Sequence, residues 1–324
     1  MKIAFSALAI VAGCGSALGF GFYGGSGLSG GYRWDAAPRQ MGGLDRSLSG
    51  GLTYSVLGGS YSSFKNVFTW SGAAPTDAAF QQAVERAFSA WTVVDPVSGL
   101  GTTISFRPDF GTAVSTSVVS GVRQGAMIDL FGASSGSTFS NGDPGLRAEA
   151  FFSAVAGTVT LTSGTANYNA APISGADVTL NANTNALWTL PWFETILRHE
   201  IGHTLGLADV DLQSGPGGTF VDDNYNPNNA AATLSNSFAG MVNIANPAAS
   251  AGLSTYSIPT SVFAQSGVDI MMESNISSFF LTNSLQNDDF AGRQFLYPTA
   301  VPEPATLAVL ALAGLAALRR RNRA

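Results

Sequence analysis

Hydrophobic and polar residues alternate along this chain with two different periods, and each period predicts a different kind of element. Between Thr76 and Trp91, apolar residues return every three or four positions: Phe80, Val84, Ala87, Phe88 and Trp91. Residues at this spacing share one face of a helix, so we predict an amphipathic helix here. Thr76 or Asp77 would serve as its N-terminal cap.

Two more helices are predicted in the second half of the chain. The first runs from Pro191 to Leu205, because proline suits the first turn of a helix and Gly206 can end one. The second covers residues 287–296, close to the C-terminus. The chain therefore carries one long helix early and two helices late.

Short runs rich in β-branched and aromatic residues, separated by Gly, Ser and Asn, predict strands. The candidates are residues 103–107, 126–131, 149–162 and 176–180. Pro108 is expected to end the first of them, since proline cannot donate a hydrogen bond to a neighbouring strand. Residues 52–70 predict a hairpin or a pair of strands.

Two segments lack any such period. Residues 20–51 are dense in Gly and Ser and predict a flexible lead-in. Residues 210–265 are rich in Asn, Gly, Ala and Pro and predict a long irregular loop. The order of the elements favours an α+β fold for a single domain over residues 52–298.

The N-terminus, residues 1–19, has the pattern of a secretory signal peptide. Lys2 precedes an apolar stretch, and small residues at positions 17 and 19 predict cleavage after Gly19. A second interpretation stays open at this end. Residues 11–14 resemble a lipobox, in which case Cys14 would be acylated.

The C-terminus, residues 301–324, carries a pattern of three parts. Pro302, Glu303 and Pro304 precede an apolar stretch, and four arginines follow it: Arg319, Arg320, Arg321 and Arg323. As a helix, residues 301–318 would be about 27 Å long, close to the ~30 Å hydrocarbon core of a bilayer. We therefore predict a transmembrane helix, with the arginines on the cytoplasmic side and the body outside.

This three-part pattern resembles the PEP-CTERM sorting signal of Gram-negative bacteria. The resemblance implies recognition by a membrane exosortase that cuts near the motif. It also implies transient anchoring by the C-terminal helix, followed by delivery to the cell surface or extracellular matrix. A plain C-terminal anchor that is never cut is the alternative.

Composition and charge exclude several classes of protein. With 324 residues, 45% hydrophobic and 11% charged, the chain is too apolar to be disordered. Its formal net charge is −6, and without the terminal segments 10 basic and 20 acidic residues remain, a balance of about −10. A basic patch for nucleic acid is therefore excluded, and membrane contact is expected only through the C-terminal segment. The single cysteine lies in the leader, so no disulfide framework is expected.

The chemistry of the chain centres on its two histidines. His199 and His203 are four residues apart on the predicted second helix, with Glu200 directly after the first. Residues four apart lie about 40° apart around a helix, so both imidazoles can grip one metal ion. A catalytic zinc normally takes three protein ligands and keeps one position for water.

The third ligand must be a carboxylate, because the chain has no third histidine and no usable cysteine. Gly206 can turn the chain back after the helix, so that Asp209 reaches the metal. Asp211 remains a competitor for this position, and Asp222 and Asp223 are more distant ones. The predicted ligands are thus His199, His203 and Asp209.

The segment from His199 to Asp209 resembles the metzincin zinc motif, HExxHxxGxxH, with aspartate in place of the last histidine, as in the snapalysin-like branch. Residues 269–273, Asp-Ile-Met-Met-Glu, resemble the Met-turn, in which a methionine packs beneath the zinc site. Met271 fits that position best, and Met272 is one residue away. Residues 285–297 resemble the closing helix of the matrixin-like metzincins, and residues 76–91 their first helix.

This resemblance implies a twisted, mostly parallel sheet with a long first helix and a zinc-site helix, followed by an irregular C-terminal subdomain. It implies a zinc endopeptidase acting on protein or peptide substrates. Glu200 would accept a proton from the zinc-bound water and pass it to the leaving amine. The alternative function is a surface or matrix-binding protein whose metal site is structural or inactive.

The loop after the site is acidic. It contains Asp211, Asp222, Asp223 and Asn224, whose oxygens are of the kind that binds calcium. Their spacing does not match an EF-hand. We therefore interpret this stretch as a solvated acidic loop, and calcium has no further support.

Overall fold

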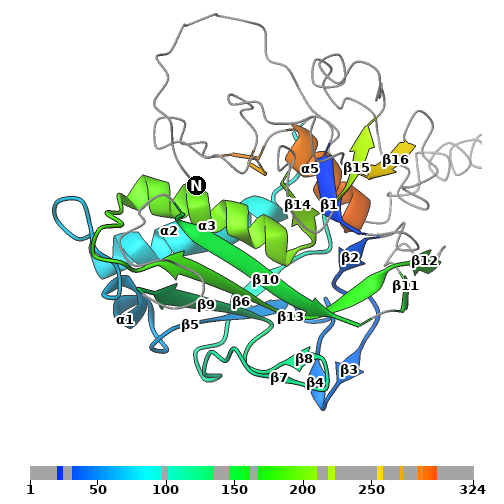
Figure 1. The fold of residues 1–324 in the computed structure, drawn as a ribbon, viewed down its shortest axis with the longest axis horizontal. Helices are drawn as coiled ribbons and strands as arrows, with labels where there is room; N and C mark the ends of the chain where they lie inside the picture. Colours follow the sequence, from blue (N-terminus) through cyan, green and yellow to red (C-terminus); the bar gives the residue numbers. More distant parts are fainter. Residues whose placement is uncertain are drawn as a thin grey trace, which may run out of the picture.

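The structure is a computed structural model. It describes residues 20–24, 31–96, 101–134, 146–155, 157–160, 167–209, 218–222, 254–257, 271–272, 284–285 and 287–297. These residues form a mixed α/β fold with a mostly parallel central sheet, helices on one face of the sheet and a second, smaller sheet at one end (Figure 1). The predicted parallel sheet is confirmed at this level.

The central sheet has the strand order β10-β13-β9-β5-β6. Only β10 runs antiparallel to its neighbour, and β2 adds a short parallel pairing to the start of β13. The bounds are β2 Tyr32–Arg33, β5 Leu52–Val56, β6 Phe106–Pro108, β9 Ile128–Ala133, β10 Ala148–Ala154 and β13 Ala171–Asn181. Apart from a shift beside β10, the register is regular, and both β6 and β10 are edge strands.

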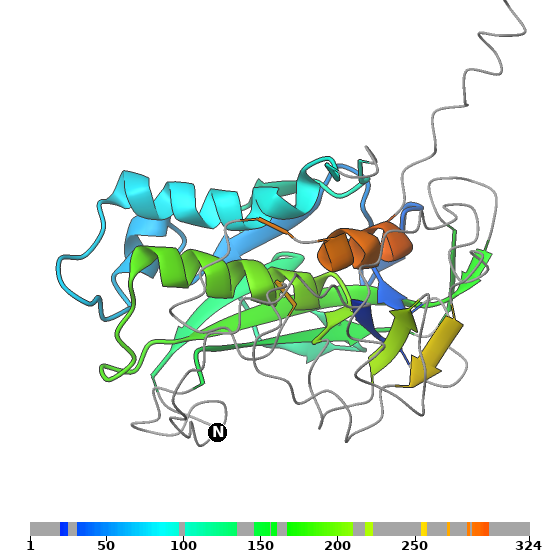
Figure 2. The same cartoon turned by 90° about the horizontal axis from the view of Figure 1, so that it is seen from above.

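Two long helices cover one face of this sheet and run side by side (Figure 2). They are α2, Asp77–Ser89, which continues as a short 3-10 turn η1, Ala90–Thr92, and α3, Leu190–Thr204. Thr76 and Thr189 cap their N-termini through their side chains. Phe80 and Phe193 pack ring against ring between them, with centroids 4.9 Å apart, and α1, Tyr61–Lys65, adds Phe64 to the same cluster.

Short hairpins cover the opposite face of the sheet (Figure 1). One pairs β3 with β4 and one pairs β7 with β8, while a third, β11 with β12, directly precedes β13 in the chain and lies beyond its start. Their bounds are β3 Gln40–Met41, β4 Leu44–Asp45, β7 Val118–Val119, β8 Val122–Arg123, β11 Thr158–Thr160 and β12 Asn167–Asn169.

The second sheet is antiparallel and has the order β14-β1-β15-β16. It joins the first strand of the chain, β1, to strands that follow α3. The bounds are β1 Phe20–Tyr23, β14 Leu207–Ala208, β15 Gly218–Asp222 and β16 Ser254–Ser257. Helix α5, Asn287–Leu296, packs beside β1, where Phe22 and Phe295 stack with centroids 4.7 Å apart.

The three helices predicted from periodicity are confirmed as α2, α3 and α5, each within one residue of its predicted start. The predicted strands 103–107, 126–131 and 176–180 correspond to β6, β9 and β13, and 149–162 divides into β10 and β11. Pro108 is the last residue of β6, so the strand ends at this proline as predicted. An edge strand tolerates this proline because one side of the strand needs no donor.

Two predictions about the first part of the domain are wrong. Residues 52–70 do not form a hairpin, because β5 pairs in parallel with β6 and β9 and is followed by α1. Tyr61 and Phe64 are both buried at helical spacing, and Ser60 caps this helix by accepting from the backbone N–H of Ser63. The first predicted run is the strand β5, whereas the second, residues 67–70, lies after α1 in a turn whose last residue, Trp70, forms an isolated bridge with Trp188.

The predicted flexible lead-in is also wrong for its described part, residues 20–24 and 31–51. Phe22 and Trp34 are fully buried, and Leu48 is buried as well. The indole of Trp34 donates to the carbonyl of Thr204 at 2.9 Å, at the end of α3. A few large apolar side chains among many glycines are enough to fix this segment against the fold.

Candidate metal centre

Helix α3 carries three of the predicted site residues on one side and packs into the core with the other. Phe193, Leu197 and Ile201 are fully buried among the aromatic residues of the core. His199 and His203 leave the helix on a different side, with ring centroids 4.6 Å apart. The helical spacing read from the sequence therefore brings both imidazoles together.

The turn after α3 brings the third residue back to the histidines. Gly206 has a φ of +97°, a conformation that other residues rarely adopt, and a Cβ at this position would collide with the carbonyl oxygen of Tyr32. The chain then enters β14, which ends one residue before Asp209. The predicted return of the chain after Gly206 is therefore present in the structure.

Three ligand atoms converge at this point. Nε2 of His199 and Nε2 of His203 are 3.0 Å apart. Oδ1 of Asp209 lies 3.2 Å from the first and 3.1 Å from the second. In a tetrahedral zinc site with bonds of about 2.0–2.1 Å, neighbouring ligand atoms lie about 3.3 Å apart. The triangle therefore has nearly the size that one zinc ion requires.

The chemistry of the three groups also fits a metal ion. Oδ1 of Asp209 is buried and has no hydrogen-bond partner among the described residues, although both imidazole nitrogens face it. Imidazole nitrogen and carboxylate oxygen are preferred zinc ligands. Within the described part of the chain, one group of potential ligands lies close enough together to share an ion: His199, His203 and Asp209.

The second nitrogen of each histidine is held by the backbone. Nδ1 of His199 lies 2.7 Å from the carbonyl oxygen of Met271, and Nδ1 of His203 lies 2.8 Å from that of Leu207. A carbonyl accepts only from a protonated nitrogen, so these contacts place the proton on Nδ1 and leave the lone pair on Nε2. Both imidazoles are thus oriented as metal ligands.

Helix α5 supports this arrangement from behind. The carboxylate of Asp289 accepts the backbone N–H of Met271 at 3.0 Å and that of Met272 at 3.1 Å. It therefore fixes the carbonyl that orients His199. The sulfur of Met272 lies against Gly202, between the two histidines on α3, whereas the contact of Met271 with the site is made by its backbone. The sequence favoured Met271 for the methionine beneath the site.

The charges of the site are strongly coupled in the metal-free protein. Burial lowers the pKa of His199, but the close contact and negative charge of the Asp209 carboxylate outweigh it and raise that pKa to about 9. The pKa of His203 is raised for the same reason, against the effect of burial. Burial would raise the pKa of Asp209, yet the two histidines hold it well below its usual range. The negative charge of Asp209 and the positive charge of the protonated imidazoles therefore stabilise each other.

Glu200 lies beside this triangle without belonging to it. Its side chain is buried, and its Oε2 has no hydrogen-bond partner among the described residues. Burial, the largest effect, raises the pKa of Glu200, while the two histidines lower it and Asp209 raises it further. A carboxylate with a raised pKa is a stronger base than an exposed one, which suits proton transfer.

Tyr23 is a site residue that the sequence analysis missed. Its ring lies 5.8 Å from that of His203 and 5.4 Å from that of Phe152 on the edge strand β10. Burial, and then the charges of Asp209 and Glu200, raise the pKa of its phenol. No local signal could identify this residue, because it belongs to β1 and meets the site only through long-range strand pairing.

The remaining predicted residues cannot be placed at the site. Asp211 and Asp223 lie outside the described residues. Asp222 is placed only as the backbone of the last residue of β15. Cys14 and the predicted leader, residues 1–19, also lie outside the described part. Asp209 is therefore the described acid that completes the triangle, and the calcium prediction stays a prediction.

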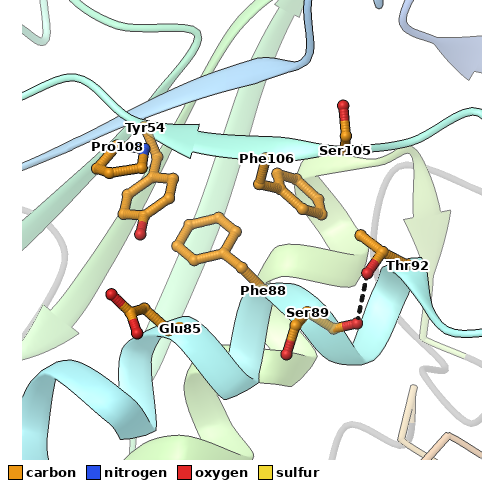
Figure 3. A pocket seen from close by; sticks show the side chains of 8 residues that line it. All are labelled: Tyr54, Glu85, Phe88, Ser89, Thr92, Ser105, Phe106 and Pro108. Atoms are coloured by element: carbon orange, nitrogen blue, oxygen red, sulfur yellow. Dashed lines mark hydrogen bonds between the residues drawn. The ribbon is translucent and has the colours of Figure 1, made fainter.

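A separate pocket lies between α2 and the edge strand β6 (Figure 3). Tyr54 and Phe88 stack in it with centroids 4.0 Å apart, and Phe106 lies next to Phe88 at 5.0 Å. Glu85 stands at the rim. The pocket has a volume of about 360 Å³ and is lined by none of the three candidate metal ligands. It is therefore not part of the candidate metal centre.

Comparison with known proteins identifies the C-terminal segment. Residues 300–323 match the PEP-CTERM protein-sorting motif. No curated protein matches the chain. The motif implies export and sorting to the cell surface in Gram-negative bacteria, which confirms the predicted sorting signal. None of the helices in the described ranges is both long and apolar enough to cross a bilayer. The predicted transmembrane helix over residues 301–318 falls outside those ranges.

Proposed function

We propose that this chain is an exported zinc-dependent endopeptidase with a metzincin-like site. The observation that carries the proposal is the triangle of His199 Nε2, His203 Nε2 and Asp209 Oδ1, whose sides measure 3.0–3.2 Å. Three protein ligands and one open position are typical of catalytic zinc. The buried carboxylate of Glu200 stands next to them.

The ligands in the proposal are His199, His203 and Asp209. Zinc bound by them would polarise the scissile carbonyl and acidify a bound water. Glu200 would accept a proton from the attacking water and later deliver it to the leaving amine, so that the same side chain would act first as base and then as acid. Its burial excludes bulk water from the proton transfer.

The fold around the site supports a peptide as the substrate. β10 is an edge strand of the central sheet and packs against α3. An edge strand offers unpaired backbone N–H and C=O groups, and an extended peptide can pair with them. A peptide in this position would run past the histidines of α3.

Further features support the likeness to the metzincins. They are the long first helix α2, the site helix α3 that ends before Gly206, and the closing helix α5 behind Met271. The PEP-CTERM motif places the proposed enzyme outside the cytoplasm. An exosortase-type protease is the proposed processing partner of that motif.

Glu200→Gln tests the proposed mechanism. We expect this variant to bind zinc as the parent does, while kcat for casein or a peptide library falls about 10²- to 10⁴-fold because the general base is lost. Zinc content is measured by metal analysis of the dialysed protein. Glu85→Gln, an exposed change on α2, is the matched control and should keep the parental rate.

The same experiment separates the enzyme from a surface protein with a structural metal. A chelator should abolish hydrolysis by the parent, and added zinc should restore it. If the parent holds zinc but cleaves no protein or peptide, the surface or matrix-binding function is correct instead. If Glu200→Gln cleaves at the parental rate, Glu200 is not the base.

A further inference from the structure

The strand that precedes Asp209 has one paired neighbour in the described part of the chain. β14 stands at the end of its sheet, next to β1. In this antiparallel pair Gly21 lies opposite Ala208 and Phe22 lies opposite Leu207. β14 is only two residues long and pairs with no other described strand; besides this pairing it contacts α3.

The contact between the two segments is close and continues beyond the strand pair. The backbone N–H of Tyr23 donates to the carbonyl of Gly206 at 2.8 Å. A Cβ at Gly21 would lie 3.1 Å from the carbonyl oxygen of Ala208 and 3.2 Å from that of Asp209. Only glycine at position 21 lets β1 approach this near to the backbone of Asp209 without displacing it.

β14 positions two of the three candidate ligands, His203 and Asp209. The carbonyl of Leu207 in β14 accepts from Nδ1 of His203 at 2.8 Å, and Asp209 is the first residue after the strand. A shift of β14 would therefore move the carboxylate and release the imidazole at the same time. The third ligand, His199, depends on Met271 and not on this strand.

The N-terminal segment is itself fixed at other points. Phe22 packs on Phe295 of α5, and the guanidinium of Arg33 donates to the carbonyl of Leu296 at 3.1 Å. The backbone N–H of Trp34 donates to the hydroxyl of Tyr297 at 3.0 Å. β1 is thus attached to α5 as well as to β14, and it can act as a support.

We propose that β1 is a positioning element of the metal centre, which sets the place of Asp209 and His203 through Gly21 and Tyr23. The inference rests on the proposed metal site. β1 is not a strand of the central sheet, so a change in it should alter metal binding more than the stability of the core. Groups that orient metal ligands typically change affinity by about 10- to 100-fold when they are altered.

Gly21→Ala and Gly21→Val form a graded test. The added methyl or isopropyl group presses on the carbonyls of Ala208 and Asp209, so the zinc Kd, measured by competition with a chelator, should rise by up to about 100-fold. Valine should have the larger effect. The Co²⁺-loaded variants should show altered d–d absorption, because the oxygen ligand is displaced. The melting temperature of the metal-free protein should change little.

Gly111→Val is the matched control. Gly111 is exposed, and a Cβ there would make only an ordinary contact, 3.6 Å from Asp109. Its zinc affinity should equal that of the parent. If Gly21→Val binds zinc as tightly as the parent, the proposal is wrong. This holds also if the metal-free variant melts at a lower temperature while its zinc affinity is unchanged. If the parent binds no zinc, or if His203→Ala binds it as well as the parent, the proposed metal site fails instead.

Discussion

Two groups of carboxylates with little exposure, among those of the described residues, have surroundings that differ in kind. Asp209, which lies beyond the end of α3, faces the two imidazoles of that helix. Asp129 and Asp177 lie opposite each other on the adjacent strands β9 and β13, where they meet arginines from the covering loops. Both groups are acidic and inaccessible, so burial and charge alone do not distinguish them.

The arginine-bound group behaves as structural support. The two oxygens of Asp129 accept the backbone N–H groups of Ser115 at 2.9 Å and Ala126 at 3.1 Å. Arg123 binds Asp177, and Arg46 donates to the carbonyl of Arg123 at 2.6 Å. Burial raises the pKa of Asp129 to about 7 and that of Asp177 to about 6. These contacts fasten the loop around β7 and β8 to the sheet.

The two groups differ in whether the side chains that face the carboxylates can offer a lone pair to a metal ion. A guanidinium has only N–H donors and no lone pair for a metal, whereas an imidazole with its proton on Nδ1 offers a lone pair from Nε2. Asp209 and the two histidines therefore have the chemistry of the proposed ligand set, while Asp129 and Asp177 form an ion network. The side chains that face a buried carboxylate, imidazole or guanidinium, therefore distinguish a candidate metal site better than the carboxylate does.

Removal of one imidazole should produce the largest effect. His203→Ala should weaken zinc binding by about 100-fold or more, because it removes one of the three proposed protein ligands. Asp177→Asn, in the ion network, should leave zinc affinity unchanged. Isothermal calorimetry on both variants makes the comparison, and an equal loss in the two would show that the groups are not separate.

Removal of a carboxylate from the ion network should affect stability instead. Asp129→Ala leaves the N–H groups of Ser115 and Ala126 without acceptors, so the free energy of unfolding should fall by about 2–3 kcal/mol. Urea unfolding of the metal-free protein measures this. The exposed change Asp77→Ala should cost much less. Zinc affinity of folded Asp129→Ala should equal that of the parent, and a weakened affinity would contradict the separation.

Over a single pH unit, the smallest change should come from the opposite response of the two groups to pH. His199 has a pKa raised to about 9 in the metal-free site, so a proton competes with zinc below that pH, and affinity should rise by up to about tenfold per unit as pH increases. The pKa of Asp129 is raised from 3.8 to about 7. Its contribution to stability is therefore complete below pH 3.8 and is lost as pH rises through 7.

Titrations of zinc affinity and of unfolding free energy between pH 5 and 9 measure the two responses separately. Asp129→Asn should flatten its part of the stability curve and leave the zinc curve unchanged. A zinc affinity that is independent of pH over this range would contradict the protonation assigned to His199.

The sequence predicted those parts of the fold and site that depend on local spacing. The helices α2, α3 and α5 follow from apolar periodicity, capping residues and breaks such as Gly206. The histidine pair follows from one helical turn, and Asp209 follows from the glycine that reverses the chain. Each of these features is determined within about ten residues, which is the range that a pattern can report.

The parts that the sequence missed depend on contacts between distant segments. Composition made residues 20–51 resemble a linker, yet Phe22 packs on Phe295 and Trp34 reaches Thr204. Asp289 gave no signal as a support of the site, because its partners are the backbone N–H groups of Met271 and Met272. Backbone partners leave no trace in residue type, so these roles cannot be read from the sequence.

The pairing of β1 with β14 has a consequence for the order of events during secretion. A chain that is threaded through a membrane from its N-terminus delivers β1 early and β14 late. Neither strand has its partner until most of the polypeptide has passed through. The proposed metal centre would thus stay incomplete until most of the chain has been exported, which would delay any hydrolysis that it performs.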